Sequence, residues 1–513
     1  LILFHSRPFL FGASPFWGNL KPGEYPVGFT VRLEYDESRT FLPKWTYDGK
    51  KTQGVRARPI QIAIWYPAAT SSKPPMLFEE YVSLIAQELN FGPLTRESKE
   101  QSRRTFVRDL MALDRANESA ANALLELPTA AVRDAAARKG AYPLILFAPG
   151  SSMTAFSDSP LCEYLASHGY IVAAMPSMGA YARDATVDQV GFYAYMQDIE
   201  FVSGYMRHFP NVDSDRLGIV GFSMGGSAAS LVQMRNTDFD AAVYLDTGAI
   251  FTIVDGWFRP IPFYNRADLR IPQLYLTRRD AEFLDPAAID TMPYAERLLV
   301  LFAKGYRHTD FISFGMFPSL VPNYDAEPRA TKPQAIFETV AQYTLRFLDA
   351  YVRKESGAQG FLLRRPEDNG VPAGLISVER KMARKAPPRE PEFLNLLRTD
   401  PQKARAIFDA MKQEDPELPI FREASLNALA YEFLARRMPD RAIDAFTLNT
   451  EAYPQSANAF DSLSEAYEAA GKKDLAIKNA RTALSLLDAD KSLDDRRREA
   501  VRRASEERLK RLN

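Results

Sequence analysis

Cysteine and histidine are scarce in this sequence. One cysteine, Cys162, and four histidines occur in 513 residues, so an intrachain disulfide and a zinc site built on several cysteines are both excluded. The chain has no run of eighteen apolar residues, and a membrane-spanning helix is not expected. It also lacks an excess of one charge, because 64 Lys and Arg residues balance 65 Asp and Glu residues. Nothing in this balance indicates a nucleic-acid partner or an anionic membrane surface.

The motifs of common cofactor and metal sites are missing as well. The sequence has no H-E-x-x-H pair and no G-x-G-x-x-G turn, so we expect neither a metal nor a cofactor. The chain begins at Leu1 instead of a methionine. Such a start is found in mature secreted or periplasmic proteins and in trimmed chains, so a secreted or periplasmic location is only a hypothesis.

Short apolar runs alternate with helix-like segments through the first two thirds of the chain. The runs lack a clean period of two, which is typical of strands buried on both faces. Alternation of strands and helices predicts a mostly parallel sheet with helices on both faces, the α/β class. The predicted strands are 59–67, 143–149, 170–176, 217–222, 241–246, 272–277 and 298–303.

Two further segments shape this predicted domain. Residues from about 76 to 140 are rich in Ala, Glu, Leu and Arg with helical spacing, and we interpret them as a helical insertion that covers one flank of the sheet or shapes a substrate entrance. After a last amphipathic helix over about 334–353, strand patterns end. The stretch 364–392 is the best linker candidate. We therefore predict an α/β domain over 1–385 and an all-α domain over 386–513.

The all-α part contains an internal repeat with a shift of 34 residues. The pair Ala442-Ile443 recurs as Ala476-Ile477, and Leu429 maps onto Leu463. Period, helix pairs and alanine positions resemble tetratricopeptide repeats. Arg437 replaces the glycine of the second unit, Gly471, so the first turn is atypical. The alternative is an ordinary helical bundle.

The chemistry centres on the run RLGIVGFSMGGSAAS, residues 216–230, which contains a G-x-S-x-G motif around Ser223. The motif alone is weak. Here it follows an apolar strand and precedes a helix that opens in small residues, as a nucleophile elbow requires. Glycines on both sides let strand and helix approach closely. We predict that Ser223 is a nucleophile; the alternative is a small residue that fills a tight turn.

A serine hydroxyl needs a base, and only one histidine fits the chain order of hydrolases. Of His5, His168, His208 and His308, only His308 follows Ser223. It lies in the loop KGYRHTDF after a predicted strand, where it can reach the sheet edge. His308 is therefore the predicted general base, against the alternative of a surface loop histidine.

Two carboxylates compete for the role of triad acid. Asp246 and Asp280 each follow a predicted strand, at the sheet edge where open parallel sheets place their sites. The commoner hydrolase order favours Asp280. Asp310 fits better as a local loop residue.

Several motifs between residues 24 and 317 point to one family: YPVGF, WYPA, PLILFAPG, LASHGYIVAA, GFSMGG, the strand ending in YLD, and GYRHTDF. With these motifs the region resembles the platelet-activating-factor acetylhydrolase family, within the dienelactone-hydrolase-like α/β-hydrolases. It implies the α/β-hydrolase fold and an acid at the end of the strand after the elbow helix, which matches Asp246. The chain departs from the family at Pro149-Gly150, where a histidine-glycine pair is usual.

An oxyanion hole needs two backbone N–H groups. Met224, directly after the nucleophile, should supply one, and the resemblance implies Ser151 for the other. The alternative for the loop at Ser151 is a glycine-serine turn with no role.

Together these features predict a serine hydrolase that cleaves small-molecule or lipid-like carboxylic esters through an acyl-enzyme. The aromatic loop 256–265 either lines the pocket or packs in the core, and Arg278-Arg279 either contacts a substrate carboxylate or forms a solvated charge cluster. The alternatives are a peptidase or other acyl hydrolase on the same fold, and a non-catalytic protein whose repeats bind a partner or drive self-association.

Overall fold

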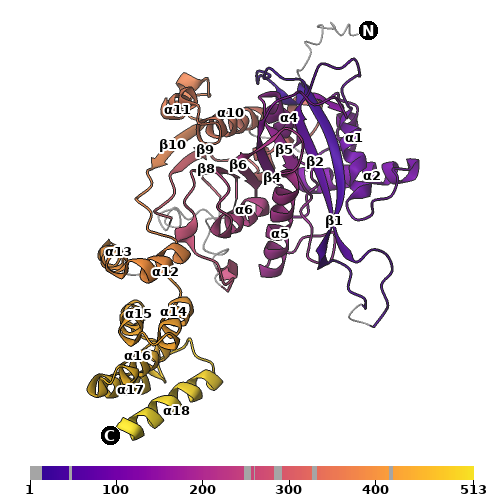
Figure 1. The fold of residues 1–513 in the computed structure, drawn as a ribbon. Helices are drawn as coiled ribbons and strands as arrows, with labels where there is room; N and C mark the ends of the chain where they lie inside the picture. Colours follow the sequence, from indigo (N-terminus) through magenta and orange to yellow (C-terminus); the bar gives the residue numbers. More distant parts are fainter. Residues whose placement is uncertain are drawn as a thin grey trace, which may run out of the picture. The chain divides into compact units, whose positions relative to one another are not determined.

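The computed structural model describes residues 14–45, 49–247, 256–258, 260–281, 292–325, 332–414 and 420–512. The chain forms two compact units, Leu1–Arg384 and Lys385–Asn513. The first unit contains a ten-stranded sheet (Figure 1), and the second consists of helices.

The sheet has the strand order β10-β9-β8-β7-β6-β4-β5-β2-β1-β3. The six strands from β9 to β5 are parallel to one another, whereas β10, β2 and β1 pair antiparallel with their inner neighbours. The mostly parallel sheet that the sequence predicts is thereby confirmed. The strands are β1 (Val27–Thr40), β2 (Ala57–Pro67), β3 (Ala131–Arg133), β4 (Tyr142–Ala148), β5 (Ile171–Ala174), β6 (Val212–Phe222), β7 (Ala241–Leu245), β8 (Gln273–Arg278), β9 (Arg297–Phe302) and β10 (Ile376–Lys381).

Each face of the sheet supports its own apolar core. Along β4, Leu144 and Leu146 point into one core, beside α5 (Gln189–Met206) and α6 (Met224–Arg235). Ile145 and Phe147 point into the other, beside α4 (Ser159–Ser167) and α10 (Gln334–Tyr351). Both faces are covered, so the buried parts of the central strands are mostly apolar and show no period of two.

The insertion between β2 and β4 is largely helical, as expected. Its α1 (Phe78–Val82), η2 (Ser83–Gln87), α2 (Arg96–Asp114) and α3 (Glu118–Leu125) bury Phe78, Leu84 and Phe106 in the core that contains α4 and α10. The end of the insertion differs from the helical prediction. There the short strand β3 pairs in parallel with β1.

The prediction that residues 364–392 form a linker is wrong for the middle of this stretch. There β10 pairs antiparallel with β9 from Ile376 to Lys381. The sequence ISVERK ends in charged residues because it forms a sheet edge, and a polar edge strand carries little of the apolar signal by which strands are recognised. A similar reason applies to the long strand β1, whose second half is polar and only partly buried.

Smaller elements connect the main ones in the first unit. They are η1 (Pro15–Trp17), η3 (Arg266–Asp268), η4 (His308–Phe311), η5 (Ser313–Gly315), α9 (Phe317–Leu320), α11 (Ser356–Leu363) and η6 (Pro366–Asn369).

The second unit repeats helical hairpins. Helices α16 and α17 repeat the bounds of α14 and α15 with a shift of 34 residues (423 to 457, 439 to 473), and Ala442 and Ala476 are both fully buried. Arg437 adopts a left-handed φ of 57°, like Gly471 at 70°. The helices are α12 (Glu390–Thr399), α13 (Pro401–Glu414), α14 (Glu423–Ala435), α15 (Pro439–Ala452), α16 (Ala457–Ala469), α17 (Lys473–Leu486) and α18 (Asp495–Leu512).

Candidate active site

Ser223 occupies a strained turn between β6 and α6. Its φ of 52° and ψ of −121° are rare for a residue with a side chain. Close packing explains the neighbouring glycines: a Cβ on Gly221 would lie 2.5 Å from Gly226 Cα, and a Cβ on Gly225 would lie 2.0 Å from Ala148 O. The turn therefore has the form of a nucleophile elbow, pressed against the end of β4.

The end of β7 braces this elbow. The Ser223 amide donates to Leu245 O at 3.0 Å, and the Thr247 hydroxyl donates to Ser223 O at 2.6 Å. Asp246 lies between these two partners in the chain. The residue that follows β7 is thus fixed directly beside the serine turn.

Asp246 and His308 are in contact. Nδ1 of His308 lies 2.6 Å from Oδ2 of Asp246. The Thr277 hydroxyl donates to Oδ1 at 2.8 Å, and Arg278 Nε donates to Oδ2 at 2.8 Å. Burial raises the pKa of Asp246, but the hydrogen bond and charge of His308, the charge of Arg278 and the Thr277 bond outweigh it and hold the pKa below its usual value.

The orientation of His308 leaves its other nitrogen available. A carboxylate only accepts hydrogen bonds, so Nδ1 carries the hydrogen and Nε2 is the basic nitrogen. The ring stacks on Phe222, with centroids 4.6 Å apart and planes at 27°. The imidazole is therefore held against Phe222, the residue that directly precedes Ser223.

A buried carboxylate from the insertion holds the histidine loop, although no motif in the sequence marks it. Asp114, at the end of α2, is 0% exposed. It accepts hydrogen bonds from the Thr309 hydroxyl at 2.6 Å and the Tyr324 hydroxyl at 2.7 Å, and Arg307 Nη1 donates to its carbonyl oxygen at 2.8 Å. Both chain neighbours of His308 are therefore tied to Asp114.

The turn after β4 lies against the elbow. A Cβ on Gly150 would lie 2.9 Å from Met153 Sδ and 3.0 Å from the Phe222 ring. The amide of Met153 donates to Gly150 O at 3.1 Å, which closes a tight turn around Ser151. Ser151 and Met224 thus belong to two segments packed together, one of them the N-terminus of α6, where the helix dipole favours negative charge.

The other candidate residues lie in different surroundings. Asp280 accepts a hydrogen bond from the Gly305 amide at 3.1 Å, and within the described residues it makes none with His308. Asp310 caps its own loop by accepting from the Arg307 amide at 2.7 Å. His168 ends α4 with Nδ1 2.8 Å from Tyr164 O, His208 follows α5, and His5 lies outside the described residues.

The structure decides between the interpretations that the sequence leaves open for Arg278 and for part of the aromatic loop 256–265. Arg278 is not part of a solvated charge cluster, because its guanidinium binds the buried Asp246. In the aromatic loop, Phe258 and Ile261 are 1% and 2% exposed and pack in the core beside α5 and α6. Both residues support the interpretation that this loop packs in the core. Arg259 lies outside the described residues.

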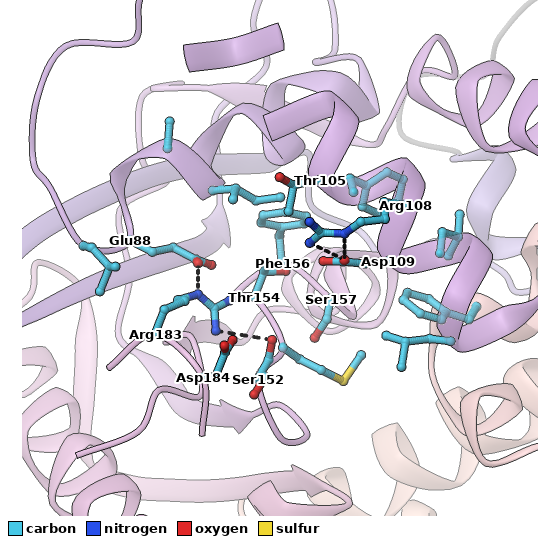
Figure 2. Close-up of a pocket in the computed structure, with 18 of the residues that line it drawn as sticks. Glu88, Thr105, Arg108, Asp109, Ser152, Thr154, Phe156, Ser157, Arg183 and Asp184 are labelled. Carbon is cyan, nitrogen blue, oxygen red and sulfur yellow. Dashed lines mark hydrogen bonds and ion pairs between the residues drawn. The ribbon is translucent and has the colours of Figure 1, made fainter. Parts of the chain in front are cut away.

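A cavity of about 330 Å³ opens between the insertion and the segment 152–157 (Figure 2). Among the described residues, no group of three or more His, Cys, Asp or Glu side chains could hold a metal ion. None of the helices in the described ranges is long and apolar enough to cross a bilayer.

Comparison with known proteins gives three similarities. A family model described as Chlorophyllase matches residues 103–257, less than half of the chain, and this span includes Ser223 and Asp246. Cutinase 1 of Thermobifida cellulosilytica and the cutinase of Thermobifida fusca (strain YX) are each 23% identical to the chain over 236 residues. These matches cover 44% of the chain and 75% and 65% of the respective cutinases. A solved ferulic acid esterase from Streptomyces cinnamoneus matches with a TM-score of 0.48 and 20% identity, over 70% of this chain and 97% of that one.

The family model and the cutinases agree with the fold and the enzyme class predicted from the sequence. The sheet with helices on both faces is that of an α/β-hydrolase, to which an all-helical region is added. The relatives support the predicted class, a carboxylic ester hydrolase.

Proposed function

We propose that this protein hydrolyses carboxylic esters through an acyl-enzyme formed on Ser223. The observation that supports this most strongly is the 2.6 Å contact between His308 Nδ1 and Asp246, made while the same ring stacks beside Ser223 on Phe222. In a histidine oriented in this way Nε2 points away from the acid, and the proposal assigns this nitrogen to the Ser223 hydroxyl. The cutinases are only 23% identical to this chain, so the nature of the substrate is part of the proposal.

The reaction follows from these roles. Ser223 Oγ attacks the ester carbonyl as Nε2 of His308 accepts its proton, and Asp246 stabilises the imidazolium. The amides of Ser151 and Met224 donate to the oxyanion. His308 then gives its proton to the leaving alcohol, and the acyl-enzyme forms. Water, activated by His308, hydrolyses the acyl-enzyme and restores Ser223.

A small-molecule or lipid-like ester suits this site. The sequence resemblance to acetylhydrolases points to esters, and so does the similarity to cutinases. The rival is a peptidase or other acyl hydrolase, since one fold serves several leaving groups.

Labelling with a fluorophosphonate probe tests the proposal. The full chain should be labelled at Ser223, as mapped by peptide mass spectrometry, and should release 4-nitrophenol from 4-nitrophenyl acetate. Ser223→Ala should lose both properties, whereas Ser227→Ala, four residues further along α6, should keep them. Absence of labelling and turnover under conditions that label a control esterase would refute the proposal.

For the second unit, Lys385–Asn513, we propose a tetratricopeptide-like domain that binds a protein partner or a second copy. The 34-residue shift between its hairpins supports this, because stacked helix pairs form extended binding surfaces. Deleting residues after 384 should keep esterase activity and change pull-down partners or oligomeric mass. If both of these properties are unchanged, the binding role is wrong.

A further inference from the structure

The cavity beside the insertion is largely apolar and lies next to the proposed reaction centre. Its walls include Phe78, Phe106, Leu110, Phe156 and Phe314. At about 330 Å³ it is at the small end of the range of ligand sites, about 300 to 1,000 Å³. Such a volume suits one part of a small ester.

Two contacts connect the cavity to the reaction centre. Met153 lines the cavity, and its sulfur packs against Gly150, next to Ser151. Phe314 lines it from the segment that follows His308. The neighbouring hydroxyl of Ser313 donates to Ser157 O at 2.9 Å, which joins the histidine segment to the 152–157 segment. An ester whose carbonyl lies at Ser151 and Met224 could therefore extend one arm into this space.

One end of the cavity is polar. Glu88 is only 1% exposed, and its Oε2 is paired with Arg183 Nε. Arg183 Nη1 also donates to the carbonyl oxygens of Ser152 and Ser177, both at 3.3 Å. Figure 2 shows this pair facing the apolar side chains, with Arg108 and Asp109 across the space.

The second oxygen of Glu88 is a buried acceptor. Among the described residues, none donates a hydrogen bond to this Oε1. Burial outweighs the opposing charge and hydrogen bond of Arg183 and raises the pKa of Glu88 to about 7. A buried acceptor without a donor costs free energy, because it has lost its hydrogen bonds to water and gained none in the protein. A ligand that brings a hydroxyl to Oε1 would recover that cost.

We propose that this cavity binds one arm of the ester substrate, an apolar group that ends in a hydroxyl, and that this hydroxyl donates to Oε1 of Glu88. The inference rests on the proposed esterase function and adds the chemistry of the substrate to it. An apolar arm without a hydroxyl would fill the same space but leave Oε1 without a donor. Hence the site should prefer the hydroxylated ester to an isosteric one that ends in methyl.

Matched esters test this preference at pH 8. The acyl pair is 4-nitrophenyl 6-hydroxyhexanoate and 4-nitrophenyl heptanoate; the alcohol pair is 6-hydroxyhexyl acetate and heptyl acetate. In one pair, kcat/KM of the wild type should favour the hydroxyl at least tenfold, and that pair identifies the arm in the cavity. A ratio near one in both pairs would overturn the inference while leaving ester hydrolysis intact. No turnover of any of the four esters would instead refute the proposed function.

Variants at Glu88 complete the test. Glu88→Leu with Arg183→Leu should bring the ratio to one or below. Glu88→Gln keeps the side-chain shape if the double variant does not fold, and it should lower the ratio several-fold because the bond loses its charge. Glu200 and Arg235 form a comparable ion pair at 2.9 Å outside this cavity, and replacing both by Leu should leave the ratio unchanged. An unchanged ratio in Glu88→Gln would overturn the inference.

Discussion

Oδ2 of Asp246 accepts hydrogen bonds from His308 Nδ1 at 2.6 Å and from Arg278 Nε at 2.8 Å. The carboxylate is thus held from two sides, at the ends of β7 and β8, and its side chain is only 2% exposed. An acid fixed in this way restricts the imidazole to one orientation. Of the two acids that the sequence left open, Asp246 has the contact a triad needs.

Replacing each acid tests that choice. Asp246→Asn should lower kcat/KM for 4-nitrophenyl acetate about 10³- to 10⁴-fold, because an amide does not stabilise the imidazolium and can reverse the tautomer. Asp280→Asn should stay within about threefold of the wild type, since Asp280 binds the Gly305 amide instead. Circular dichroism should show both variants folded. A large loss in Asp280→Asn alone would make Asp280 the acid.

Asp114 offers a second test, of a positioning role. In Asp114→Asn one acceptor oxygen becomes a donor, so the Thr309 and Tyr324 hydroxyls can no longer both donate to this side chain. We expect kcat to fall about tenfold with KM within twofold, because the histidine loop loses its fixed position while the binding surface remains. Tyr324→Phe keeps the Thr309 bond and should hold kcat within threefold. A lower melting temperature with unchanged kcat in Asp114→Asn would show a purely structural role.

The sequence predicts those parts of the site that local patterns encode. Ser223 is recognisable because strand, glycines and helix are contiguous around it, and His308 because chain order leaves no other histidine. Asp246 needed a family resemblance, since spacing alone also allowed Asp280. The central parallel strands were recognisable because burial on both faces makes them continuously apolar.

The remainder depends on contacts between distant segments. Asp114 meets Thr309 across 195 residues, and Arg183 meets Glu88 across 95. In the sequence each is an ordinary charged residue on a helix or loop. The edge strand β10 has the sequence pattern of a linker because its exposed face is polar. Such features follow from the assembled fold, which a one-dimensional pattern does not contain.

The same change, glycine to alanine, should have opposite effects on stability at two helical positions with different surroundings. Gly225→Ala should lower the free energy of unfolding by about 3 kcal/mol and reduce activity, because the new methyl would lie 2.0 Å from a backbone oxygen of β4. Gly204, exposed within α5, has nothing within 4 Å of an added methyl. Gly204→Ala should therefore raise that free energy by about 0.5 to 1 kcal/mol. Urea unfolding monitored by tryptophan fluorescence measures both, and equal effects at the two positions would contradict the close packing of the elbow.

The buried Glu163 in α4 should make the free energy of unfolding depend on pH. Glu163 is 1% exposed and accepts hydrogen bonds from the Tyr81 hydroxyl at 2.7 Å and the Ala130 amide at 3.0 Å. Burial nevertheless dominates over these bonds and raises its pKa from 4.5 to about 7. The folded state therefore binds this proton more tightly than the unfolded state does. The stability contributed by the proton is complete below pH 4.5 and is lost as pH rises toward 7.

This dependence on pH can be measured by comparing the wild type with Glu163→Gln. Between pH 5 and pH 8 the wild type should lose stability more steeply than Glu163→Gln, by an amount on the order of 3 kcal/mol in the free energy of unfolding. The raised pKa of Glu88 acts in the same direction in both proteins and cancels in the comparison. Glu126→Gln, at an exposed position, should follow the wild-type curve. If calorimetry gives parallel curves for Glu163→Gln and the wild type, Glu163 is already ionised in the folded protein at pH 5, and its burial does not control its charge.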